Sequence, residues 1–99
     1  DVSMILHTLS ASPSSTSFRE CLAVLAEDDC LLLLGDGVYA ASAGSADWES
    51  LAASGAEIHV LQPDARAAGI TELADTAIET DMDGFVELSE RCSRQMAWY

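Results

Sequence analysis

The stretch Cys30-Leu31-Leu32-Leu33-Leu34-Gly35-Asp36-Gly37 decides the fold of this chain. Its apolar part has no polar alternation, which is typical of a strand that is covered on both faces. The Gly-Asp-Gly turn then stops the run abruptly. The stretch therefore predicts a central strand of a parallel sheet.

Other short runs on either side of this stretch predict the remaining strands, at Met4 to Leu9, Glu57 to Leu61, Thr76 to Glu79 and Gln95 to Tyr99. Strands that alternate with helical segments are typical of α/β folds, in which right-handed crossovers join parallel strands. We predict one α/β domain over residues 1–99, with a mainly parallel sheet of about five strands. Because Met4 resembles an ordinary start residue, we expect Asp1 to Ser3 to precede the natural start.

Capping residues predict where the first two helices begin. Ser17 and Glu20 have the spacing of a capping box, and Asp47 is a suitable cap for a second helix from Trp48 to Ser54. The first helix is expected to end near Glu27-Asp28. Its apolar residues recur at helical spacing and should face the core: Phe18, Cys21, Leu22 and Leu25.

The last helix is predicted to begin at Asp81 or Asp83. Arg91 would lie in its last turn, where a cation interacts favourably with the helix dipole. The apolar residues expected to face inward are Phe85, Val86, Leu88 and Cys92.

The charge balance excludes several classes of function. The chain has 17 acidic residues against four arginines, which gives a net charge of −13. A direct nucleic-acid binder needs a basic stripe to displace counterions, and four dispersed arginines do not form one. The chain also lacks an apolar run of about 18 residues and a basic N-terminal region before an apolar segment. We expect a cytoplasmic protein that contacts neither nucleic acid nor membrane.

The three cysteines are the candidates for thiol chemistry. Their number is odd and their spacing unpaired, which argues against a disulfide framework and against a zinc site. Cys21 is the best candidate, because the amides and dipole at the start of a helix lower the pKa of a thiol. Its alternative role is that of a small apolar core residue. Cys30 and Cys92 lie within apolar patterns and are expected to be structural.

The Gly35-Asp36-Gly37 turn follows a buried strand at its carboxyl end, where open α/β sheets place ligands. It lacks the third glycine of a dinucleotide fingerprint and the lysine of a P-loop. A structural turn is therefore favoured over a ligand loop. His7 and His59 have no second ligand at metal-binding spacing, so we expect neither a metal nor another cofactor. His7 is expected to bond to a backbone carbonyl or to assist a nearby thiol.

Several segments resemble the TusB/DsrH family, and together they cover nearly the whole chain. The most specific are Ile5-Leu6-His7-Thr8, Asp36-Gly37-Val38-Tyr39-Ala40 and the closing Ala97-Trp98. Further similarity lies in Ser12-Pro13 and in Val60-Leu61-Gln62-Pro63-Asp64.

The resemblance implies a flavodoxin-like (DsrE/F/H-like) three-layer α/β subunit of a TusBCD or DsrEFH hetero-hexamer, in which persulfide sulfur passes between cysteines. The main sulfur-carrying cysteine of the family belongs to the TusD/DsrE subunit, and Leu61-Gln62-Pro63-Asp64 carries none here. DsrH-like members have a cysteine early in the first helix. Cys21 matches that position, which makes it a candidate persulfide acceptor.

Two classes of function follow. The first is an accessory, non-enzymatic subunit of a sulfur relay that serves 2-thiolation of the tRNA wobble uridine, or, in the other branch, sulfur oxidation. Its partners would be TusC/DsrF-like and TusD/DsrE-like subunits and a downstream sulfur acceptor. The second is an independent α/β domain that binds a small ligand, which the fold alone permits.

We expect the isolated chain not to bind tRNA at physiological salt, because its charge of −13 repels the phosphate backbone. Electrophoretic mobility shifts over a salt series measure this directly. A tight complex that weakens steeply with added salt would contradict the prediction.

Overall fold

Strand β2 (Cys30–Leu33) lies in the middle of the sheet, as its uninterrupted apolar sequence predicts, and all of its residues are buried. The computed structural model describes residues 4–99, so Asp1 to Ser3 lie outside the described part. The sheet has the order β4-β3-β2-β1-β5, and every neighbouring pair is parallel. The remaining strands are β1 (Ile5–Leu9), β3 (Glu57–Leu61), β4 (Ile78–Thr80) and β5 (Arg94–Trp98). The predicted α/β fold with a five-stranded parallel sheet is confirmed.

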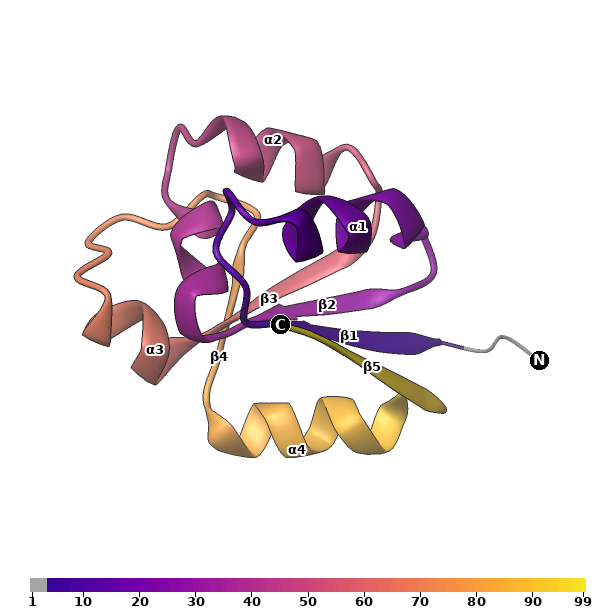
Figure 1. The fold of residues 1–99 in the computed structure, drawn as a ribbon. Coiled ribbons are helices and arrows are strands. Elements are labelled where there is room, and N and C mark those ends of the chain that lie inside the picture. Colours follow the sequence, from indigo (N-terminus) through magenta and orange to yellow (C-terminus); the bar gives the residue numbers. More distant parts are fainter. Residues whose placement is uncertain (1–3) are drawn as a thin grey trace.

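The direction of each crossover decides which face of the sheet its helix covers. From β1 to β4 the chain steps across the sheet in one direction, and the connection from β4 to β5 runs back. Because such crossovers are right-handed, the last helix must lie on the opposite face. Figure 1 shows α1 and α2 above the sheet and α4 below it. The helices are α1 (Thr16–Val24), η1 (Gly35–Ala41, a 3-10 helix), α2 (Ala46–Ala52), α3 (Gln62–Ala67) and α4 (Met82–Arg91).

Two apolar clusters fill the space on the two faces. The larger cluster joins α1, η1, α2 and α3 to the sheet, and it includes Phe18, Leu33 and Val60. The smaller cluster lies under α4, and its buried members are Leu6, Cys30, Leu32, Leu61, Leu88 and Cys92. In the described part of the chain, α4 is thus the one helix that covers the second face of the sheet.

Both predicted N-caps were wrong by two residues. Ser15, not Ser17, caps α1, and its Oγ accepts a hydrogen bond from the Phe18 amide at 3.1 Å. Ser45, not Asp47, caps α2 by accepting from the amides of its first turn. Helix α1 also ends at Val24, before the expected Glu27-Asp28.

A backbone turn before each helix explains these shifts. The Ser15 amide donates to the Ser12 carbonyl at 2.9 Å, and the Ser45 amide donates to the Ser42 carbonyl at 3.1 Å. Each turn leads directly into an extended serine, with ψ of 160° at Ser15 and 134° at Ser45. This conformation is the one that an N-cap needs.

The last helix begins after Asp81, whose carboxylate accepts a hydrogen bond from the Gly84 amide at 2.8 Å. Leu88 and Cys92 are buried as predicted, and Phe85 is half-buried. Val86, however, is 54% exposed, so its predicted inward position was wrong. Within residues 4–99, Figure 1 shows no second helix beside α4.

Gly37 marks a close approach between η1 and β1. A Cβ atom at this position would lie 2.3 Å from the Leu9 carbonyl oxygen. We expect Gly37→Ala to lower the free energy of unfolding by about 1–3 kcal/mol, because the backbone must shift to relieve the overlap. Urea denaturation followed by circular dichroism measures this difference.

Gly44→Asn is the matched control for this prediction. Gly44 has φ of +81°, which strains any side chain but asparagine less than most, and a Cβ there would have no neighbour within 4 Å. Equal losses of stability in the two variants would contradict the assigned role of Gly37.

Candidate functional site

Cys21, the predicted thiol site, lies in the second turn of α1 and faces the sheet. Its side chain is 0% exposed. Burial raises the pKa of the Cys21 thiol to about 12, and the negative charge of Asp29 adds to the effect. The expected lowering of this pKa was wrong, because the field at a helix start fades within the first turn and burial dominates beyond it. Cys21 therefore occupies the position of a core residue.

Cys30 and Cys92 lie on the other face of the sheet, in the cluster under α4. Both are buried, as predicted, and all three cysteines are free. Burial raises the pKa of Cys30 to about 11, although the guanidinium of Arg91 acts in the opposite direction. The Arg91 Nη2 atom lies 3.3 Å from the Cys30 sulfur.

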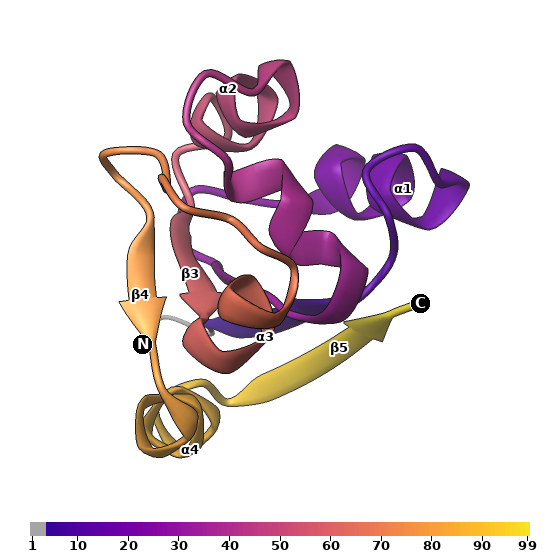
Figure 2. The same ribbon diagram turned by 90° about the vertical axis from the view of Figure 1, so that its left-hand side faces the viewer.

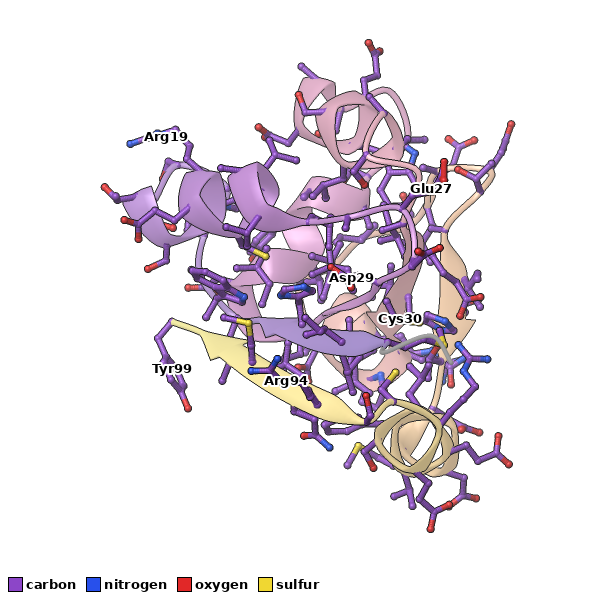
Figure 3. All side chains as sticks on the ribbon, turned by 90° about the vertical axis from the view of Figure 1, so that its right-hand side faces the viewer. Arg19, Glu27, Asp29, Cys30, Arg94 and Tyr99 are labelled. Carbon is purple, nitrogen blue, oxygen red and sulfur yellow. The ribbon has the colours of Figure 1, made fainter. Side chains whose placement is uncertain are left out.

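The sequence analysis missed a polar cluster around Glu57. This carboxylate accepts hydrogen bonds from His59 Nε2 at 2.6 Å and from Arg91 Nη2 at 2.5 Å. The His59 and Arg91 contacts hold the pKa of Glu57 below its usual range. Cys30 lies at the edge of this cluster, at the start of β2 (Figure 3). The spacing of Glu57 and His59 places both on one side of β3, but nothing in the sequence indicates the distant Arg91.

Most polar side-chain atoms of the Glu57 cluster already have a hydrogen-bond partner within the chain. His59 Nδ1 lies 2.7 Å from the Thr80 hydroxyl, so both ring nitrogens have partners. A shallow pocket of about 290 Å³ adjoins the cluster, and its rim includes the acidic residues Glu79, Asp81 and Glu87. The cluster joins α4 to β3, and it presents no free pair of nucleophile and base.

His7 forms a second buried network with Asp29 and Trp98. The indole Nε1–H of Trp98 donates to His7 Nδ1 at 3.1 Å, and His7 Nε2 lies 3.0 Å from the Asp29 carboxylate. An indole only donates and a carboxylate only accepts, so His7 carries its proton on Nε2. The same Asp29 oxygen accepts from the Ala26 amide at 3.0 Å. His7 thus bonds to a carboxylate rather than to the expected carbonyl or thiol.

The Gly35-Asp36-Gly37 segment lies at the carboxyl edge of the sheet beside the start of α3. The Gly35 amide donates to the Asp64 carboxylate at 2.7 Å, so the chain itself occupies a donor that a ligand would need. The adjoining pocket of about 250 Å³ is lined by Gly35, Asp36, Tyr39, Asp64, Ala67 and Ala68. It contains two carboxylates and no cysteine, which favours the structural turn over a phosphate-binding loop.

Residues 4–99 contain neither a candidate metal site nor a candidate membrane span. Within this range, no three or more histidine, cysteine, aspartate or glutamate side chains are grouped so that they could hold a metal ion. No helix in the same range is long and apolar enough to cross a membrane.

Comparison with known proteins places the chain in a family. Residues 11–95 match the family described as DsrH like protein. Protein TusB of Escherichia coli O139:H28 is 42% identical over 95 residues, which span 95% of this chain and 100% of TusB, and Protein TusB of Shigella boydii serotype 18 matches equally well. The crystal structure of the ychN protein from E. coli shares the fold, with a TM-score of 0.77, 16% identity and coverage of 97% of this chain and 99% of that one. The chain belongs to the DsrH-like family, as its TusB/DsrH-like segments indicated.

Proposed function

We propose that this chain is an accessory subunit of a cytoplasmic relay that passes persulfide sulfur between proteins toward the tRNA wobble uridine. Membership of the DsrH-like family supports a role as a sulfur-relay subunit. The burial of all three cysteines supports the accessory, non-enzymatic part of the proposal, because a thiol that receives sulfur must be reached by its donor. Three unpaired cysteines also fit a reducing compartment.

The branch of the relay is part of this proposal. The TusB-like sequence extends over the full length of the relatives at 42% identity, which favours tRNA thiolation over sulfur oxidation. Partners would be one TusC-like and one TusD-like subunit, with the whole chain acting as one domain. The cysteine that accepts sulfur would then belong to the TusD-like partner.

If sulfur passed through this chain, Cys21 would be the candidate residue to carry it. Transfer to Cys21 requires α1 to separate from the sheet first, because the thiol is fully buried and its pKa is raised to about 12. We therefore assign Cys21 a packing role in the folded chain and restrict any sulfur loading to an opened state.

Alkylation of the native chain at neutral pH should be slow at Cys21. A pKa raised from 9.0 to about 12 reduces the thiolate population about a thousandfold, since each pKa unit is a factor of ten. Mass spectrometry after timed iodoacetamide exposure, with the urea-unfolded chain as reference, measures the rate. Rapid native labelling of Cys21, together with persulfide loading that Cys21→Ser abolishes, would instead show a sulfur-carrying subunit.

Assembly tests the accessory role. A domain of 99 residues has a small core, so a permanent partner should raise its melting temperature. We expect the tagged chain to co-purify with co-expressed TusC- and TusD-type proteins of E. coli and to melt at a higher temperature in that complex. A chain that stays monomeric and melts at the same temperature in their presence would favour an independent domain.

A further inference from the structure

Helix α4 carries an apolar stripe that residues 4–99 of the chain do not cover. Met82, Phe85 and Val86 have the i, i+3, i+4 spacing that places side chains along one side of a helix. Met82 is 55% exposed and Val86 is 54% exposed. Phe85 is half-buried and packs against the apolar cluster under α4. The exposed stripe is therefore continuous with this part of the core.

The sheet beside this stripe is also open. Figure 2 shows α4 below the β4 side of the sheet, and β5 extends away from it. In the β1–β5 register, Leu6 pairs with Gln95 and Thr8 pairs with Ala97. Leu6 belongs to the cluster under α4, so its paired and alternate neighbours point to that same face. Gln95 and Ala97 are nevertheless exposed.

An all-parallel sheet is ordinarily covered on both faces. Among residues 4–99, the crossover directions leave α4 alone for the second face, and α4 lies under one half of it. The open half of this face therefore has the geometry of a layer that another protein completes.

The surrounding charge indicates what kind of protein fits. Asp83 and Glu90 are exposed on α4, and they lie beside the stripe because they stand three residues before and four residues after Val86. A second copy of the chain would bring the same carboxylates and another net charge of −13 against this surface. A partner with arginine or lysine side chains around an apolar centre would instead pair with these carboxylates.

We propose that Met82, Phe85 and Val86 of α4, together with Thr8 and Ala97 of the sheet, form a docking surface for a different protein subunit. The contacting surface of that subunit is apolar at its centre and basic at its edge. This docking surface rests on the proposed function, because the subunit it receives is a member of the relay complex. The surface also explains why Val86 has an apolar side chain at an exposed position.

The test compares Val86→Glu with Val24→Glu in the wild-type background. Val24 lies at the end of α1 and is 53% exposed, so the two substitutions place the same charge at nearly equal exposure on different helices. Each tagged chain is first co-expressed with E. coli TusC and TusD to test co-purification. Each chain is also purified alone, and its affinity for the same two proteins is measured by biolayer interferometry. We expect Val86→Glu to weaken binding about tenfold or more, because it buries an unpaired charge, and Val24→Glu to leave it unchanged.

A second pair of variants tests the basic edge of the partner. Neutralising the two carboxylates beside Val86, in Asp83→Asn with Glu90→Gln, should weaken binding at low salt and flatten its dependence on salt concentration. Glu20→Gln with Glu27→Gln makes the same change of charge on and just after α1 and should have no effect. Melting temperatures within a few degrees of wild type would show that all four variants fold.

The outcomes separate this surface from the proposed function. If wild type binds and Val86→Glu binds equally well, the docking surface is overturned while the proposed function stands. If wild type binds neither E. coli protein, both proposals fail. If wild type dimerises alone in size-exclusion chromatography and Val86→Glu prevents it, the occupant is a second copy and the proposal of a basic partner is wrong.

Discussion

The right-handed crossover between parallel strands is the constraint on which the rest of this structure depends. Because β1 to β4 follow one another across the sheet, their connecting helices gather on one face and produce the larger apolar cluster. The return from β4 to β5 places α4 alone on the other face. One topological rule thus produces a well-covered face, a half-covered face and the unequal size of the two clusters.

This packing also determines the chemistry of the thiols. Cys21 fills space between α1 and the sheet, and Cys30 begins the central strand, so neither can be solvated without opening a cluster. Burial raises both pKa values, to about 12 and about 11, since a thiolate in an apolar environment lacks hydration. Arg91 reduces this effect at Cys30 but is engaged by Glu57 at 2.5 Å. All three cysteines are therefore part of the packed interior of the chain.

The sequence predicted those features that local patterns determine. Apolar runs located the strands, and the uninterrupted run at Cys30 to Leu33 correctly indicated the centre of the sheet. The starts of α1 and α2 were misplaced because the cap depends on a backbone turn, such as that between Ser15 and Ser12, which competes with a capping-box match, whereas the start of α4 at Asp81 was among the predicted positions. Local patterns do not predict contacts between distant segments. The hydrogen bond from Arg91 to Glu57, for example, joins residues 34 positions apart in the sequence. The exposure of Val86 likewise follows from strand order, which periodicity does not encode.

The C-terminal strand shows why the open face of the sheet is preformed. Most residues of β5 are exposed, so its own burial contributes little to hold it in place. The His7–Asp29–Trp98 network supplies the missing constraint, because its one compatible tautomer joins Trp98 through His7 to the turn before β2. The Ser10 amide adds a bond to the Trp98 carbonyl at 3.1 Å. Figure 3 shows β5 leading away from α4 toward Tyr99. A strand fixed in this way presents Ala97 and Gln95 without further ordering, and a rigid surface loses less entropy when a partner binds.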